Sequence, residues 1–155
     1  MKKLSIDNEC ITTEDIGYKI APLINAVGRI GDPKHIIDLL TNESTKCIEK
    51  LIKECLSMHR ERKRLTTLIE QEALEIAQCQ YNENRKFIVI SKRKWHPGII
   101  GIVAARIVDK FNLPTAILAI ANDGNFRGSI RSNNRLKVNR ALDECKDLLI
   151  AKLLL

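Results

Sequence analysis

The most constraining feature of the sequence is a stretch from Ser44 to Gln80 that contains neither glycine nor proline. Apolar residues recur in it at steps of three and four, which is the spacing of one face of an α-helix, and charged residues lie between them. The stretch therefore predicts one long amphipathic helix over residues 44–80. Arg62 and Glu72 interrupt the apolar face, which favours a connecting helix packed on neighbours at both ends over a sustained coiled coil.

After this helix the sequence alternates between short apolar runs and helical segments. Strands are expected at Lys86–Ser91, Pro114–Ala121 and Phe126–Arg131, with a turn at Asn122–Asn125 and helices at Pro97–Phe111 and Val138–Ile150. The order strand, helix, strand, turn, strand, helix predicts an α/β fold with a small mixed sheet.

The residues before the long helix have a different pattern. The run Ala21–Arg29 is apolar but punctuated by proline and glycine, which predicts loop and a short helix. Asp32-Pro33 marks a turn and the start of a second short helix that ends near Thr41-Asn42. This part is therefore expected to be helical and separate from the α/β part.

The composition points to an anionic partner. The formal net charge is +7, and a basic surface favours nucleic acid, although a lysine-rich solvated surface without a specific partner is the alternative. Aromatic residues make up only 4% of the chain, which argues against an RNA-binding sheet covered with stacking rings.

Cysteine usage and the apolar segments indicate the compartment. The cysteines are odd in number, five, and none forms a Cys-x-x-Cys pair, which is typical of free thiols in a reducing cytosol. No signal-peptide apolar region follows Met1, and the longest apolar stretch, Ile99–Val108, contains Arg106 and is too short to span a bilayer. A cytoplasmic protein without a membrane partner is expected.

The segment Lys92–Gly101 is the first candidate for binding chemistry. A strand ends, a basic loop follows, and a helix begins, so free backbone N–H groups could favour a phosphate. Trp95 could offer a stacking face to a base, and His96 could donate to a phosphate oxygen. The alternative is that Trp95 belongs to the core and that Gly98 and Gly101 only permit close packing.

A second candidate is the segment Arg127–Arg135. Strand alternation places Arg127, Ser129 and Arg131 on one face, and two guanidiniums around a hydroxyl suit a phosphate backbone. Gly128 would let a ligand approach closely. The alternative is an exposed edge strand that its charges keep soluble.

Other polar residues give weaker signals. Asn25, Gly28 and Arg29 lie together, but this combination occurs in many loops. His35 and His59 lie on expected helices without a carboxylate or histidine at ligand spacing, so structural or surface roles are expected. The sequence contains no Asp-His pair.

Three motifs occur in a fixed order: Ala21-Pro22-x-Ile24-Asn25-Ala26-x-Gly28-Arg29, then Trp95-His96-x-Gly98-Ile99-Ile100-Gly101-Ile102-Val103-Ala104-x-Arg106, then Gly128-Ser129-x-Arg131-Ser132. Together they resemble the RecJ family of single-stranded-DNA-specific exonucleases, of the DHH phosphoesterase superfamily, over roughly residues 11–150. The resemblance implies an N-terminal domain whose Asp-His-His motif and further aspartates hold two Mn²⁺ or Mg²⁺ ions for phosphodiester hydrolysis. It also implies a long helix leading to a DHH-associated domain that grips the DNA during digestion from the 5′ end.

The resemblance divides the chain into three parts. Residues 1–43 would be a remnant of the end of the catalytic DHH domain, residues 44–80 the connecting helix, and residues 81–155 the DHH-associated domain. Where the family carries Gly-Gly-His, the chain has Leu153-Leu154-Leu155, so a C-terminal truncation and an internal gene fragment are expected.

The resemblance also assigns residues. Asn25 and Arg29 would line the cleft near the metal centre, and the contacts to single-stranded DNA would come from His96, Gly98, Ser129, Arg131 and Ser132. No catalytic residue, metal ligand or cofactor is expected within this chain, so it would bind DNA without hydrolysing it. Two alternatives stay open: a non-catalytic subunit that completes an exonuclease with a separately encoded DHH catalytic domain, and a related phosphoesterase acting on short oligonucleotides.

Overall fold

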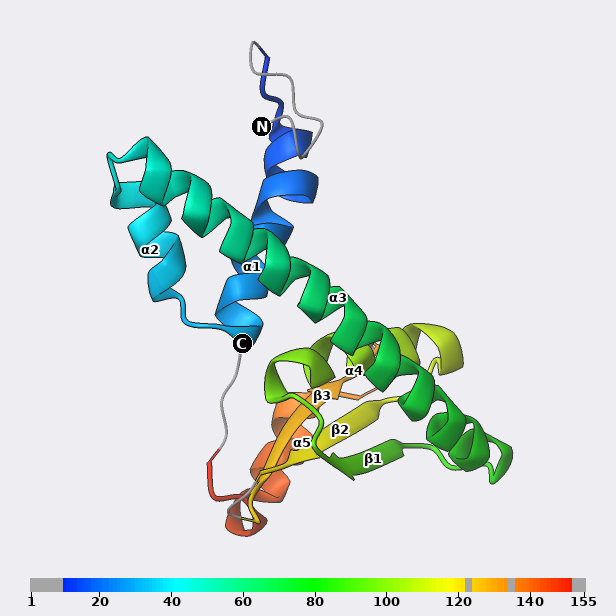
Figure 1. The fold of residues 1–155 in the computed structure, drawn as a ribbon. Helices are drawn as coiled ribbons and strands as arrows, with labels where there is room; N and C mark the ends of the chain where they lie inside the picture. Colours follow the sequence, from blue (N-terminus) through cyan, green and yellow to red (C-terminus); the bar gives the residue numbers. More distant parts are fainter. Residues whose placement is uncertain (1–9, 122–123, 134–135, 152–155) are drawn as a thin grey trace. The chain divides into compact units, whose positions relative to one another are not determined.

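The computed structural model describes residues 10–121, 124–133 and 136–151. They divide into two compact units, Met1–Leu65 and Thr66–Leu155 (Figure 1). The long helix expected from the sequence is present as α3 (Thr45–Asn82), and it runs without interruption through the division between the units. None of the described helices combines the length and the apolar character that a membrane crossing needs.

The first unit is helical throughout its described elements. These are a π-helix η2 (Asp15–Ile20), α1 (Ala21–Ile30), α2 (Lys34–Thr41) and the first part of α3. The expected loop within Ala21–Arg29 is wrong. Pro22 lies in the first turn of α1, where its missing N–H leaves no hydrogen bond unmade, and Gly28 is tolerated inside the helix.

Buried side chains and one long-range hydrogen bond hold α1 against α3. Ala26 and Val27 are fully buried. Nδ1 of His59 lies 3.2 Å from the carbonyl oxygen of Pro22, so this histidine has the structural role expected for it. Gly31 lies so close to Met58 that a Cβ there would come within 2.8 Å of the Met58 sulfur.

The second unit contains the expected α/β fold. Its elements after α3 are β1 (Ile88–Arg93), α4 (Pro97–Phe111), β2 (Thr115–Ile120), β3 (Phe126–Arg131), α5 (Val138–Glu144) and the 3₁₀-helix η3 (Lys146–Leu148). The sheet is mixed, because β2 pairs in parallel with β1 and antiparallel with β3. The expected turn between β2 and β3 falls partly outside the described residues, at Asn122 and Asp123.

The closing helix is shorter than expected. The apolar spacing predicts that it reaches Ile150, but α5 ends at Glu144 and a 3₁₀ turn follows. No residue of α5 is buried. A helix without a buried face gains little from tertiary packing, which supplies most helix stability in proteins, so the apolar spacing alone does not extend it.

The core of the second unit forms between α4 and one face of the sheet (Figure 1). The buried residues of α4 are Ile99, Ile100, Val103, Ala104, Ile107, Val108 and Phe111. Ile88, Ile90 and Ile117 of the sheet are also fully buried. The strand register places these three isoleucines on one face, because Ile88 and Ile90 pair with Thr115 and Ile117.

The side chain of Gln80 covers part of the open edge of β1. Its amide Nε2 donates to the carbonyl oxygen of Val89 at 2.7 Å, and its Oε1 accepts from the N–H of Val89 at 3.0 Å. The glutamine amide therefore pairs with the strand as a neighbouring backbone would. An unpaired edge exposes backbone donors and acceptors, so this contact both protects β1 and fixes the end of α3 on the sheet.

Replacing Gln80 with alanine should lower the free energy of unfolding of the second unit by about 1 kcal/mol, because two hydrogen bonds to Val89 are lost. Urea denaturation followed by the fluorescence of the single tryptophan, Trp95, measures this. Gln71→Ala is the matched control, since Gln71 is exposed on the same helix. Equal stabilities for the two variants would contradict the assigned contact.

Candidate nucleic-acid interface

The row of Arg127, Ser129 and Arg131 is present on one face of β3. These residues pair with Ala119, Ile117 and Thr115 of β2, respectively. Ile117 is buried on the face that α4 covers, so the row lies on the α4 side of the sheet. Arg127 and Arg131 are exposed and Ser129 is half-buried.

Gly101 of α4 makes room for the middle of this row. A Cβ built at Gly101 would lie 3.0 Å from the hydroxyl oxygen of Ser129 and 3.7 Å from Nη2 of Arg131. Any side chain there would push the hydroxyl and the guanidinium away from the helix. The close approach of α4 and β3 therefore brings Ser129 and Arg131 together, and no carboxylate forms an ion pair with Arg131 among the residues that the structure describes.

His96 caps the start of α4. Its Nδ1 accepts a hydrogen bond from the N–H of Gly98 at 3.1 Å, and its carbonyl oxygen accepts from the N–H of Ile99 at 2.9 Å. Because Nδ1 is an acceptor here, the neutral ring carries its proton on Nε2, which can donate to a ligand. The expectation that His96 donates to a phosphate oxygen stays a prediction, and this geometry is compatible with it.

The expectation that free N–H groups at this helix start would hold a phosphate is wrong. Pro97 has no N–H, Gly98 donates to the His96 ring, and the N–H groups of Ile99 and Ile100 reach the His96 carbonyl oxygen. The first turn is thus satisfied internally. The hydrogen bond from Gly98 orients the His96 ring, and the predicted contact of Gly98 with DNA stays a prediction.

Trp95 belongs to the core. Only 6% of its surface is exposed, so the expectation of a stacking face for a base is wrong. Its Nε1 donates to Oε2 of Glu72 at 2.7 Å, and the same oxygen lies 3.0 Å from Nζ of Lys92. The indole therefore anchors the loop before α4 to α3.

Sequence reasoning did not assign a role to Glu72. Its signal was present, because Glu72 interrupts the apolar face of the long helix. The hydrogen bond from Trp95, followed by that from Lys92, holds the pKa of Glu72 below its usual value of 4.5. The carboxylate of Glu72 therefore stays ionised. It holds the indole of Trp95, the residue that precedes His96.

Ser132 and Asn133 follow β3 and turn the chain towards the end of α4. The Ser132 hydroxyl donates to the carbonyl oxygen of Asn133 at 2.6 Å, so its proton is used within the loop. The amide of Asn133 donates to the carbonyl oxygen of Asn112 at 3.2 Å and to the Asn112 side chain. Ser132 can therefore meet a ligand only as an acceptor in this arrangement.

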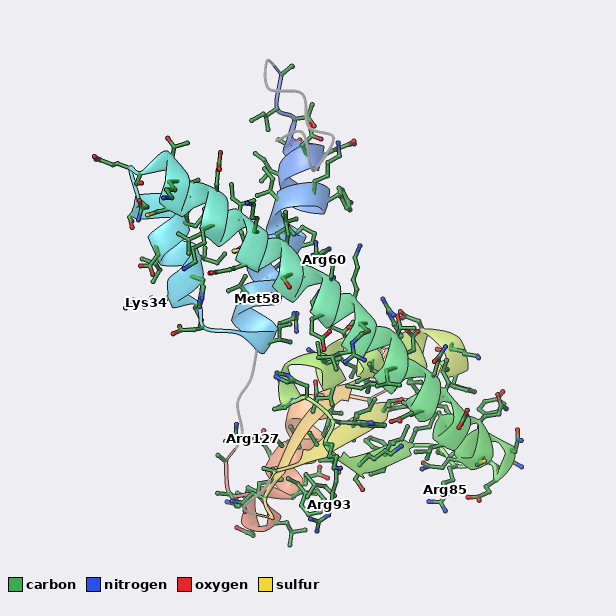
Figure 2. All side chains as sticks on the ribbon, viewed as in Figure 1. Lys34, Met58, Arg60, Arg85, Arg93 and Arg127 are labelled. Atoms are coloured by element: carbon green, nitrogen blue, oxygen red, sulfur yellow. The ribbon has the colours of Figure 1, made fainter. Side chains whose placement is uncertain are left out.

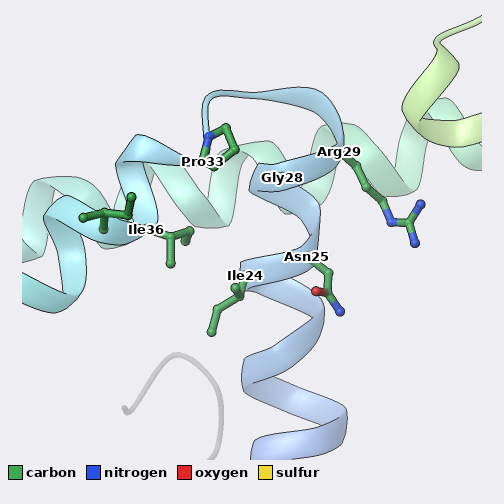
Figure 3. Close-up of a pocket in the computed structure, with 7 residues that line it drawn as sticks. Ile24, Asn25, Gly28, Arg29, Pro33 and Ile36 are labelled. Atoms are coloured by element: carbon green, nitrogen blue, oxygen red, sulfur yellow. The ribbon is translucent and has the colours of Figure 1, made fainter. Parts of the chain in front are cut away.

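Asn25 and Arg29 lie in the first unit, whereas the other predicted residues lie in the second. They are one turn apart on α1 and project from the same side of it (Figure 3). Both line a cavity of about 460 Å³ whose remaining wall comes from Ile24, Gly28, Pro33, Ile36 and Ile37. The Asn25 amide and the Arg29 guanidinium at the edge of this largely apolar cavity can bind a polar group of a ligand.

The candidate interface is made of hydrogen-bond donors. Across residues 10–121, 124–133 and 136–151, no group of three or more histidine, cysteine, aspartate or glutamate side chains is placed to hold a metal ion. The side chains around Ser129 and Arg131 are donors, which bind anions. The donors of the described site are therefore suited to binding phosphate.

The fold and the basic face define the class of the second unit. Residues 84–149 match the DHHA1 domain family. The chain belongs to the RecJ family, as a segment that carries this domain. The motifs around Asn25, His96 and Ser129 had indicated this family, and the comparisons confirm it.

Relatives with a curated description support the assignment along most of the chain. The single-stranded-DNA-specific exonuclease RecJ of Bacillus subtilis is 35% identical over 137 residues, which are 88% of this chain and 17% of that protein. RecJ of Thermus thermophilus is 31% identical over 136 residues, and RecJ of Escherichia coli is 29% identical over 147 residues. The chain spans 17% to 25% of the length of these relatives.

Solved structures show the same arrangement. RecJ from Thermus thermophilus in complex with Mg²⁺ matches 88% of this chain with a TM-score of 0.75 and 28% identity, over 21% of that chain. An exonuclease RecJ bound to manganese matches 90% of this chain with a TM-score of 0.75 and 27% identity, over 34% of that chain. The long helix followed by a mixed three-stranded sheet is therefore a RecJ fold.

Replacing Glu72 with glutamine should change the pH dependence of stability. The pKa of Glu72 is lowered in the folded chain, so its stabilising contribution is present above its unfolded value of about 4.5 and is lost as pH falls through the folded value. Glu72→Gln can still accept from Trp95 but lacks this contribution. The stability advantage of the native chain over the variant should therefore stay level from about pH 7 to about pH 5 and shrink as pH falls below about 4.5.

Urea denaturation at a series of pH values, followed by Trp95 fluorescence, measures that difference. Glu75→Gln is a control on the same helix, because Glu75 is exposed and the ion pair with Lys92 is made by Glu72. A difference between the native chain and Glu72→Gln that stays constant with pH would show that the carboxylate charge does not hold Trp95.

Proposed function

We propose that this chain binds single-stranded DNA through β3 and the start of α4, as the nucleic-acid-gripping part of a RecJ-type exonuclease. The observation that carries the proposal is the placement of Ser129 and Arg131 over Gly101, where a hydroxyl and a guanidinium share one edge of the sheet. The relatives are named single-stranded-DNA-specific exonucleases.

The spacing of the row suits a sugar–phosphate backbone. Alternate residues of a strand lie about 6.7 Å apart, which is comparable with the separation of successive phosphates in an extended single strand. Arg127, Ser129 and Arg131 can thus meet neighbouring phosphates, with the Nε2–H of His96 as a further donor. Such contacts position DNA of any sequence, as an exonuclease requires.

The same proposal assigns the parts of the chain. Residues 81–155 would form the DNA-binding domain, residues 44–80 the connecting helix, and residues 1–43 the end of a catalytic DHH domain. Asn25 and Arg29 would then line the cleft beside the metal centre. Their exposed rim position on α1 supports this role, since a polar rim suits a surface that meets substrate.

We further propose that these residues bind DNA without hydrolysing it. RecJ structures contain Mg²⁺ or Mn²⁺, and the described residues provide no ligand cluster for either ion. Hydrolysis would depend on a DHH domain that supplies the ligands, encoded together with this segment or separately. Degradation of single-stranded DNA by the purified chain with Mn²⁺ present would overturn this part.

Replacing Arg131 with alanine should weaken binding of a labelled oligothymidylate by roughly five- to tenfold, a loss of about 1–1.4 kcal/mol, since one charge-assisted phosphate contact is removed. The slope of log affinity against log salt should also fall by about 0.7, the value for one phosphate on a single strand. Fluorescence anisotropy across a salt series gives both quantities.

Arg85→Ala is the matched control, because it removes the same charge from an exposed residue of the second unit whose guanidinium pairs with Glu83. It should leave the affinity within about twofold and the slope nearly unchanged. If the two variants behave alike, binding is a general effect of net charge and the assigned interface is wrong.

A further inference from the structure

A second cavity lies where the sheet meets the start of α4. Its volume is about 290 Å³. Its wall comes from three segments. These are residues 94–97, which lead into α4, residues 119–121 at the end of β2, and Arg127 at the start of β3. This is the carboxyl end of the parallel strands β1 and β2, the place where open α/β sheets bind ligands.

Two cationic side chains line this cavity. Lys94 and Arg127 both contribute to its wall, and no carboxylate forms an ion pair with either of them among the described residues. Lys94 has a φ of 68°, a left-handed conformation that is uncommon for a lysine. The backbone thus holds a lysine in an unusual conformation beside an arginine, which suits an anionic group.

Apart from His96, the rest of the wall is apolar. Pro97, Ala119 and Ala121 have small or rigid side chains and form the surface available to a base, whereas Trp95 contributes only the 6% of its surface that is exposed. Small residues leave the space open, and an apolar wall beside two cations is complementary to a molecule with a flat ring and a negative charge. A bare phosphate would leave the apolar wall uncovered.

We propose that this cavity takes up one nucleotide of a single strand, with the base against the apolar wall and the phosphate between Lys94 and Arg127. The inference rests on the proposed function, because Arg127 is the first member of the row that continues through Ser129 and Arg131. The row would follow the backbone, and the cavity would hold a base at one end of it. No sequence-specific hydrogen bonds are needed for such uptake.

Two kinds of variant distinguish contact with the base from contact with the phosphate: one fills the cavity, and the other removes a positive charge from its wall. Ala121→Leu adds a side chain at the open end of β2, where Ala121 is half-buried, and should weaken binding of oligothymidylate at least about fivefold with an unchanged salt slope. Arg127→Gln and Lys94→Asn should each weaken binding at least about threefold and lower the slope by about 0.7. Asparagine is chosen at position 94 because it tolerates the left-handed conformation.

Arg93→Gln is the matched control. Arg93 carries the same charge beside Lys94 but is not part of the cavity wall, so its replacement should leave the affinity within about twofold. Figure 2 labels both Arg93 and Arg127, which extend from different strands. Circular dichroism of each variant confirms that the fold is kept before affinities are compared.

Small probes identify the ligand class. Thymidine 5′-monophosphate should bind the full chain at least about tenfold more tightly than 2-deoxyribose 5-phosphate or inorganic phosphate, as measured by NMR titration. Equal binding of all three would overturn the inference, because the cavity would then be a simple anion site. Oligonucleotide binding that depends on Arg127 and Arg131 but not on Ala121 or Lys94 would also overturn it, while leaving the proposed function standing.

Discussion

The packing of α4 on the sheet is the interaction on which the second unit depends. Seven residues of this helix are buried, and burying one large aliphatic or aromatic side chain contributes roughly 1.5–3 kcal/mol. The same packing sets the positions that matter for binding. It brings Gly101 under Ser129 and Arg131, and it places the His96 cap at the carboxyl end of the parallel strands. A core interaction thus determines the geometry of an exposed row of donors.

Polar contacts from α3 then fix the orientation of this core. Glu72 accepts from Trp95, Glu70 from Arg106, and Gln80 pairs with the backbone of Val89. Apolar packing alone tolerates small rotations of a helix, whereas hydrogen bonds at separate points along α3 do not. The contact between Glu72 and Trp95 has a direct consequence for the site, because the next residue is His96.

The elements whose pattern is local could be predicted from the sequence. The absence of glycine and proline with a three-and-four spacing predicted α3 to within two residues at each end, and the strand and helix over Phe126–Arg131 and Pro97–Phe111 match the structure. Features that depend on partners far away in the chain escaped prediction. Trp95 was ambiguous because its partner, Glu72, is 23 residues away. The hydrogen bonds from the first-turn N–H groups of α4 to His96 could not be predicted either, because they depend on how the His96 ring and carbonyl group are placed.

An NMR titration of the ¹⁵N-labelled chain with oligothymidylate tests the central claim most directly, because it locates the bound strand residue by residue. The proposed interface predicts that shifts concentrate at residues 94–101 and 127–133. Val89 and Ser91, which lie on the opposite face of the sheet from Ile88 and Ile90, should change little. Shifts confined to α5 or spread evenly over surface lysines would contradict the account.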